Sequence, residues 1–367
     1  MSETRALLTE TAGRMFGDLC TRECSEAAEA GTWPEALWQS LSDTGIVAAA
    51  VSEARGGAGA EPADLYALAR VLGYHAAPVP LVETWLGEQM LASAGLPPIE
   101  GPTSVGPVLR RDTVRLERHG AGWTLTGTLK RVPWGRDSTA LVLAAEADGG
   151  ARTLVISRQV LRASRWKEGW SYAREPRDEI TFDGLRISDD CVAPAKTGWG
   201  RGELFFRGAL FRTQQMAGAM ERTLELTVAY AKERVQFGRV IGKFQAVQQQ
   251  IAALASQVAA ASACAQGAAE ANAHGLSRFE IAAAKARIGE AVATVAGVAH
   301  QVHAAIGFTH EHALHRSTRR LWSWRDEFGT ETEWQAWVGA VAAQLGGEGL
   351  WPYVVTSRKA DLGVALP

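Results

Sequence analysis

The sequence predicts an α+β protein built, in chain order, from an N-terminal α-helical domain, a middle antiparallel β domain and a C-terminal four-helix bundle. Two changes in the spacing of apolar residues carry this prediction. The spacing is three or four residues up to about position 100, two over short runs from there to about 198, and helical again afterwards. We therefore place the domains at residues 1–100, 101–198 and 199–367.

Three amphipathic stretches predict the helices of the first domain. They are ALLTETAGRMF (6–16), PEALWQSLSDTG (34–45) and PADLYALARVLG (62–73). Between the last two lies the glycine-rich VSEARGGAGAE (51–61), which we interpret as a loop. It lacks the GxGxxG spacing and follows no clear strand, so we do not expect it to hold a phosphate.

Short alternating or apolar runs between Gly, Asp and Arg turns predict the strands of the middle domain. These runs are DTVRLER, GWTLTG, STALVLAAE, RTLVISR and DEITFDGLRI. Several short strands at this spacing are typical of a small antiparallel sandwich or barrel.

Two apolar seams predict the packed helices of the bundle. The first seam comprises Phe244, Val247, Ile251, Leu254 and Val258. The second comprises Ile281, Ile288, Val292, Val295, Ala299 and Val302. A third long helix is expected from near Leu210 to Arg234, and long helices with short connections favour a four-helix bundle.

Composition limits the classes of partner. Of 367 residues, 47% are hydrophobic and 21% charged, and the net charge is −2. This balance predicts a soluble, cytoplasmic protein and favours neither nucleic acid nor an anionic membrane. We find no apolar run near the roughly 20 residues that cross a bilayer. The first 20 residues are charged and typical of a helix rather than of a signal peptide.

Cysteines and histidines suggest no metal site. We expect all four cysteines to be reduced, structural thiols: Cys20, Cys24, Cys191 and Cys264. Five histidines lie close together in sequence, but no carboxylate set accompanies them at ligand spacing: His300, His303, His310, His312 and His315.

The stretch RVQFGRVIGKFQAVQQQIA (234–252) resembles the Arg-x-x-Phe-Gly-x-x-Ile-x-x-Phe-Gln-x-x-Gln signature of the acyl-CoA dehydrogenase family of flavoproteins. QVHAAIGFTHEHALH (301–315) resembles that family's Gln-x-x-Gly-Gly-x-Gly segment. EARGGAGAEPADLY and VLGYHAAPVPLVETWLG resemble the N-terminal domain of its shorter bacterial members. The resemblance covers nearly the whole chain. It implies the predicted fold and an FAD-dependent α,β-dehydrogenation of a CoA thioester.

The resemblance also implies a cofactor site shared between subunits. Arg234 would pair with the FAD pyrophosphate of a neighbouring subunit through its planar guanidinium. Phe237 and Ile241 would pack beside that FAD, Gln245 and Gln301 would offer amide hydrogen bonds, and Thr330 would contact the flavin of its own subunit. The alternative is that Arg234 is a helix-end cation and Phe237 a corner plug.

Two departures from the family pattern and one tryptophan bear on this site. The paired glycines of the second motif are Ala304 and Ala305 here, and their methyl groups would narrow a cofactor groove. The segment LPPIEGPTSVGPVLRRD (96–112) matches the family's flavin-contacting loop poorly. Trp134 either lies against the flavin ring or plugs a strand end. We expect Trp322, Trp324, Trp334 and Trp337 to be packing residues.

The catalytic base has no obvious candidate. In many family members a carboxylate precedes Gly-Thr, but Phe328 precedes Gly329 and Thr330 here. The position of the base in other members falls on Gly208. Nearby carboxylates are Asp326, Glu327, Glu331 and Glu203, each of which we interpret as a solvated surface acid. The catalytic residue is therefore unknown.

Four hypotheses follow. The first is a subunit that acts with a second acyl-CoA dehydrogenase chain in a mixed dimer or tetramer, on an acyl-CoA and with an electron-transfer acceptor. By analogy, such complexes handle bulky acyl groups. The second is a self-sufficient homo-oligomer with Glu327 or a nearby acid as base. The others are a non-catalytic structural partner and a changed reaction, such as desulfination or decarboxylation.

Overall fold

The computed structural model describes residues 3–196, 199–273, 275–356 and 361–366. Contacts divide the chain into two compact units. The helical unit comprises Met1–Arg22, Tyr66–Ala77 and Ala209–Pro367, and the β unit comprises Glu23–Leu65 and Pro78–Gly208. The three predicted domain boundaries are a different division of the chain and stay a prediction.

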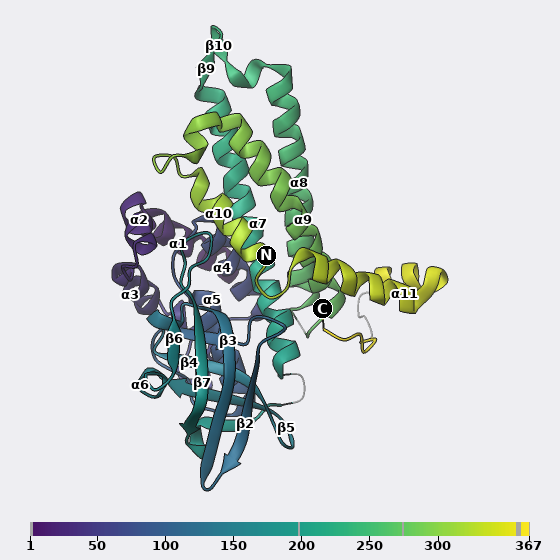
Figure 1. The fold of residues 1–367 in the computed structure, drawn as a ribbon. Helices are drawn as coiled ribbons and strands as arrows, with labels where there is room; N and C mark the ends of the chain where they lie inside the picture. The colour runs from purple at the N-terminus through teal and green to yellow at the C-terminus, as the bar shows by residue number, and fades with distance from the viewer. Residues whose placement is uncertain (1–2, 197–198, 274, 357–360, 367) are drawn as a thin grey trace. The chain divides into compact units, whose positions relative to one another are not determined.

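An eight-stranded sheet forms the centre of the β unit (Figure 1). Its strands are β1 Thr103–Gly106, β2 Thr113–His119, β3 Gly122–Pro133, β4 Ala140–Ala147, β5 Gly150–Ser157, β6 Arg165–Lys167, β7 Arg177–Ile187 and β8 Val192–Pro194. The order is β6-β7-β3-β2-β4-β5-β8, with β1 beside β4. Most pairs are antiparallel, as predicted. The pairs β1–β4 and β2–β4 are parallel, which alternation within single strands does not reveal.

Among its described residues, the β unit also contains four helices, of which α5 and α6 contact the sheet. They are α2 Arg22–Glu29, α3 Glu35–Asp43, α5 Leu81–Ala94 and α6 Arg158–Leu161, with 3₁₀ turns η1 Val47–Ala50, η2 Glu53–Arg55, η3 Gly135–Asp137 and η4 Asp189–Cys191. Helix α5 is buried along most of its length. Gly87 lets it approach β1, since a side chain there would lie 2.9 Å from Thr103. The indole of Trp85 donates a hydrogen bond to the Ile46 carbonyl at 3.0 Å.

The helical unit is a bundle whose helices are α1 Glu3–Leu19, α4 Pro62–Tyr74, α7 Arg201–Glu233, α8 Gln245–Ala271, α9 Arg278–His303, α10 Leu314–Arg325 and α11 Glu331–Val355. The first residues of α4 and α7 belong to the β unit. The hairpin of β9 Val235–Gln236 and β10 Arg239–Val240 leads through η5 Ile241–Lys243 into α8, and η6 Ala304–Phe308 follows α9. Met216, Leu254, Val292 and Trp324 share its core.

The two predicted seams differ in outcome. All six residues of the α9 seam are buried, which confirms that prediction. In the α8 seam only Leu254 and Val258 are buried. Phe244, Val247 and Ile251 are half-buried, so the predicted seam continues along the first turns of α8 with less cover.

Two helices pass a simple test for membrane spans. They are α8 and the segment Arg278–Phe308, which are long and apolar enough by length and composition alone. Core helices of soluble proteins pass the same test, so this finding is weak evidence. The cytoplasmic location stays a prediction.

Helices α4 and α7 cross at backbone contact. A Cβ at Gly73 would lie 2.0 Å from the Gln215 carbonyl oxygen, and one at Gly218 would lie 2.0 Å from the Arg70 carbonyl oxygen. The close crossing therefore depends on these two glycines, each of which faces the backbone of the other helix.

We predict that Gly73→Ala lowers the free energy of unfolding by about 3 kcal/mol, because the two helices must separate to admit the methyl group. The measurement is urea unfolding followed by circular dichroism. Gly267→Ala is the matched control, since Gly267 lies in α8 with open space around it. That change is expected to raise the unfolding free energy by up to about 1 kcal/mol. Equal effects of the two substitutions would contradict the close crossing.

Candidate functional site

The Arg-x-x-Phe-Gly segment forms a tight β-hairpin between α7 and α8. Gln236 pairs with Arg239, and the two turn residues Phe237 and Gly238 have φ of +53° and +77°. Two successive positive φ angles are typical of a two-residue hairpin turn and suit glycine, whereas a phenylalanine is strained there. The Phe237 side chain is nevertheless 92% exposed and touches only Phe244, edge to face, among the ring contacts of the described residues. A strained, exposed aromatic side chain indicates a contact outside the chain.

Arg234 stands at the end of α7, immediately before this hairpin. Its backbone carbonyl accepts a hydrogen bond from the Ile241 amide at 2.8 Å. The side chain is exposed, and among the described residues its guanidinium has no ion-pair or hydrogen-bond partner. Gln245 is exposed in the first turn of α8, and Ile241 is half-buried in η5. The structure thus presents a free cation, an aromatic ring and an amide on one short segment.

Gln301 lies at the same level of the bundle as this segment. Helices α8 and α9 run antiparallel, and Arg287 donates to the Gln257 side chain at 2.5 Å. Counting along both helices from that pair puts Gln245 opposite about residue 299. Gln301 is exposed in the last turn of α9. Five of the six predicted cofactor residues therefore gather at the end of the bundle marked by the hairpin (Figure 1).

A groove of about 360 Å³ runs beside Gln301. Small residues and larger polar and aromatic residues line it: Ala293, Ala296, Gly297, His300, Gln301, Ala304, Phe308 and Trp322. The ring of His300 stacks on Phe308 at 4.4 Å, and its Nε2 lies 2.9 Å from the Thr318 hydroxyl. The buried Nδ1 of His300 has no partner in the described structure. A groove lined by small apolar residues, two aromatic side chains and an amide suits a planar ligand with polar groups.

Ala304 keeps the backbone conformation of the glycine it replaces. Its φ is +54° and its ψ −140°, a region that L-residues rarely occupy. Ala304 and Ala305 are both exposed, so their methyl groups face the groove and the solvent rather than the core. The groove thus remains open despite both substitutions.

Thr330 lies apart from the other five residues. It caps α11: its hydroxyl accepts from the Glu333 amide at 3.3 Å, and its own amide donates to the Glu333 carboxylate at 2.8 Å. A Cβ on Gly289 would lie 3.0 Å from Glu331, and Gly289 precedes Gln301 by twelve residues of α9. That spacing corresponds to about 18 Å along the helix axis. The capping role explains Thr330 without a cofactor, so its flavin contact stays a prediction.

The turn before α11 holds Phe328 in place. Phe328 is 1% exposed with φ +51°, and Gly329 follows with φ +95°. Glu327 is buried and accepts from Arg212 Nε at 2.8 Å. The ammonium of Lys285, fully buried on α9, donates to the carbonyls of Arg325 at 2.6 Å, Gly329 at 3.0 Å and Trp324 at 3.3 Å. Burial lowers the pKa of Lys285 to about 7, and the carboxylates of Glu327 and Asp326 oppose this shift.

None of the four candidate acids is a free carboxylate in the interior. Glu327 pairs with Arg212, Glu331 with Arg325 at 2.7 Å, and Glu203 with Arg207 at 2.7 Å. Asp326 is exposed. Because three of these carboxylates already pair with a guanidinium and the fourth is exposed, we assign no catalytic base among the described residues.

Trp134 packs inside the β unit. Its side chain is 5% exposed, and its ring meets Trp33 edge to face at 6.5 Å. This burial favours the strand-end plug over the flavin-stacking alternative. Three residues on, burial raises the pKa of Asp137 to about 6, an acid that sequence patterns do not single out.

The histidines and tryptophans act mainly as packing residues. His303 stacks on Tyr230 at 4.6 Å and meets His312 at 4.5 Å. Burial lowers the pKa of both imidazoles. Trp324, Trp334 and Trp337 are buried as expected, whereas Trp322 is 37% exposed beside the groove. Within the described residues, no three His, Cys, Asp or Glu side chains are grouped to hold a metal, and the four cysteines are free.

A helical domain, a β domain and a bundle with this hairpin define a class of flavin-dependent dehydrogenases. The model of the acyl-CoA dehydrogenase N-terminal domain matches residues 2–97, and that of the C-terminal domain matches residues 205–332. The chain belongs to the acyl-CoA dehydrogenase family, whose members are FAD-dependent oxidoreductases. The family and the fold are thus confirmed.

Individual relatives support this assignment. Acyl-CoA dehydrogenase IpdE2 of Mycolicibacterium smegmatis is 31% identical over 319 residues, which cover 86% of this chain and 91% of that protein. A 3-sulfinopropanoyl-CoA desulfinase of Paraburkholderia xenovorans is 30% identical over 221 residues, 56% of this chain and 56% of that protein. The structure of the ChsE4-ChsE5 complex from Mycobacterium tuberculosis superposes with a TM-score of 0.82 at 24% identity, covering 94% of this chain and 98% of that one.

We predict that Lys285 makes the stability of the protein depend on pH. Its folded pKa of about 7 lies below the ordinary value of 10.5, so the unfolded chain binds more protons between these values. The free energy of unfolding therefore rises with pH across that window. In urea unfolding, the difference between the native protein and Lys285→Met should grow by about 2 kcal/mol from pH 7 to pH 9. A difference independent of pH would contradict this prediction, and the exposed Lys232→Met is the control.

Proposed function

We propose that this chain is an FAD-binding subunit of an acyl-CoA dehydrogenase that oxidises a CoA thioester together with a second, different chain. The membership of the family supports the reaction class. The single observation that carries the proposal is the hairpin, where an unpaired Arg234 and a strained, exposed Phe237 stand together.

The residues at the hairpin end of the bundle fit one end of an FAD molecule. Arg234 pairs with the pyrophosphate, because a guanidinium fork matches phosphate oxygens. Phe237 and Ile241 cover the cofactor, and the amides of Gln245 and Gln301 hold its polar groups. The groove beside Gln301 receives a planar part of the cofactor. An exposed site of this kind needs a neighbouring subunit to present the cofactor.

The reaction requires a proton acceptor that this chain does not provide. FAD, when bound, supplies the acceptor for the hydride from the β-carbon. The α-proton of a thioester is weakly acidic and needs a base beside it. Phe328 has no basic atom, and the two buried acids, Glu203 and Glu327, and the half-buried Glu331 each pair with an arginine. We therefore assign the base to the partner chain. The fold also occurs in a complex of two named chains, ChsE4 and ChsE5, which supports a mixed assembly.

Arg234→Ala is predicted to lower the FAD content of the purified assembly at least about tenfold, since one charge-assisted phosphate contact is worth about 1.5–3 kcal/mol. The measurement is flavin absorbance per chain, followed by titration of the stripped protein with FAD. Lys232→Ala removes the same charge from an exposed side chain two residues away and should leave the flavin content unchanged. Equal flavin loss in both variants would reduce the effect to general electrostatics and refute the direct contact.

Anaerobic bleaching of the flavin with a panel of acyl-CoA substrates tests whether the partner chain supplies the base. We expect the chain alone, even when reconstituted with FAD, to show no bleaching, and the assembly with a co-expressed acyl-CoA dehydrogenase chain to bleach. Bleaching by the chain alone that Glu327→Gln abolishes, with the circular dichroism spectrum unchanged, would establish the self-sufficient enzyme instead. Preparations that stay colourless in every combination would favour the structural partner. Product formed without flavin reduction would point to a changed reaction.

A further inference from the structure

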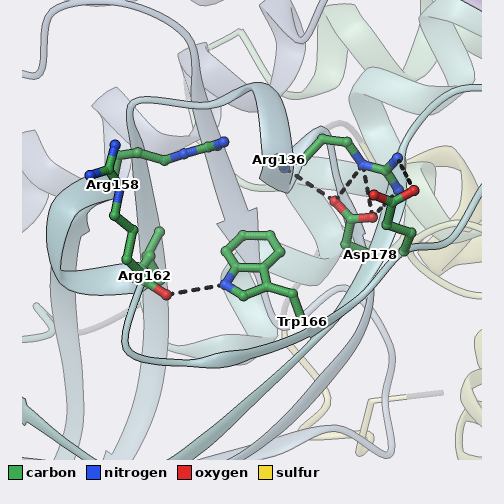
Figure 2. A pocket seen from close by; sticks show the side chains of 7 residues that line it. Arg136, Arg158, Arg162, Trp166 and Asp178 are labelled. Carbon is green, nitrogen blue, oxygen red and sulfur yellow. Dashed lines mark hydrogen bonds and ion pairs between the residues drawn. The ribbon is translucent and has the colours of Figure 1, made fainter.

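A second cavity lies in the β unit. Its volume is about 380 Å³, within the range of small-molecule sites. Turn η3, helix α6 and strands β6 and β7, with the residues that directly follow α6 and β6, contribute its lining: Arg136, Arg158, Leu161, Arg162, Trp166, Glu168 and Asp178. Figure 2 shows Arg158 and Arg162 on one side, the Arg136–Asp178 pair on the other, and the Trp166 indole between them. These residues lie between the two segments that the family models match.

The Arg136–Asp178 side is fixed and fully engaged. Asp178 is 1% exposed and accepts from Arg136 Nε at 3.0 Å, from the Arg136 amide at 3.1 Å and from the Gly169 amide at 3.2 Å. Arg136 also donates to the Gly169 carbonyl at 2.9 Å and lies over the Trp170 ring at 4.4 Å. This pair is electrically balanced and forms a rigid wall.

The opposite side carries unused donors. Arg158 donates through Nη1 to the carbonyls of Gly135 at 3.2 Å and Ser138 at 3.3 Å, which anchors its guanidinium and leaves its other N–H groups free among the described residues. Arg162 has no partner for its guanidinium in that part of the structure. The two arginines are four residues apart, so their like charges repel each other at a cost of a few tenths of a kcal/mol. An anion between them would remove that repulsion.

Trp166 supplies a ring face and no free polar group. Its indole N–H already donates to the Leu161 carbonyl at 3.1 Å. The lining carries three arginines against two carboxylates, and Glu168 is exposed and pairs with Arg136 at 3.2 Å. Asp137 is the further acid nearby and is influenced by Arg158. The free charge in the cavity is therefore positive and is concentrated at Arg158 and Arg162, beside an aromatic ring.

We propose that this cavity binds a phosphate monoester carried on a planar ring, with the phosphate between Arg158 and Arg162 and the ring against Trp166. Guanidinium groups match phosphate oxygens, and an indole face suits a heterocycle. A nucleotide has this chemistry, either free or as the nucleotide end of a larger molecule. The proposal does not rest on the flavin site, because every residue it uses belongs to the β unit.

Isothermal titration calorimetry with adenosine monophosphate tests the site, with coenzyme A as a second probe to distinguish the two sources. Inorganic phosphate and adenosine serve as the separate halves of the ligand. We expect millimolar or tighter binding of the monophosphate and weaker binding of both halves. Arg162→Ala and Arg158→Ala should each weaken binding about tenfold. Arg165→Ala is the matched control, since Arg165 is 75% exposed on β6 and does not line the cavity.

Two results would overturn the proposal. One is adenosine monophosphate binding that survives in the Arg158→Ala, Arg162→Ala double variant as well as in the Arg165→Ala control. The other is the absence of any binding to the native protein at matched ionic strength in potassium chloride. Flavin content measured on the same samples separates this result from failure of the FAD site, because the three substitutions leave the helical unit unchanged.

Discussion

The buried charges around Lys285 fix the turn that contains Phe328, the position where the family resemblance places a catalytic carboxylate. One ammonium group on α9 binds three carbonyls at the end of α10 and the start of α11, while Arg212 of α7 holds Glu327. Removing either partner of a buried ion pair leaves an uncompensated charge, which costs several kcal/mol. These buried interactions therefore stabilise the turn whichever residue follows Glu327. The backbone at position 328 is held in a defined conformation, and the side chain at that position determines which chemical group the turn presents.

Backbone strain marks the same places that the motifs mark. Among the described residues, seven non-glycine residues have positive φ, and four of them are Trp134, Phe237, Ala304 and Phe328. Each of these four lies in a segment that the family resemblance singles out. Strained residues persist only where the surrounding structure determines them, and they concentrate at functional sites. Strain and motif are independent observations, one from geometry and one from residue identity, so their agreement strengthens both.

Periodicity was sufficient to predict the order of helices and strands and the buried face of α9, because those features depend on local spacing. It did not predict the parallel pairing of β1 and β2 with β4, which depends on strands distant in sequence. Charged helix residues such as Lys285 and Arg212 are expected at the surface, and only the carbonyls and carboxylate of other helices explain their burial. The cavity beside Trp166 likewise joins four separate elements. The hairpin residues were predicted from a motif. The structure adds that Arg234 and Phe237 are exposed and that the Arg234 guanidinium has no partner among the described residues.

The segments that the family resemblance assigns to cofactor binding and to proton removal lie in separate parts of the bundle. The hairpin and Gln301 stand at one end, and the Phe328 turn packs against α9 about 18 Å from Gln301 along the helix. Because α9 connects the two as a rigid helix, a substitution at position 328 leaves the hairpin unchanged. In the proposed function, a chain can therefore lack the carboxylate at position 328 and still bind FAD. This separation is the physical reason why, in the proposed function, two chains of one fold can share a reaction. One chain retains the carboxylate, and the other retains the residues that bind the cofactor.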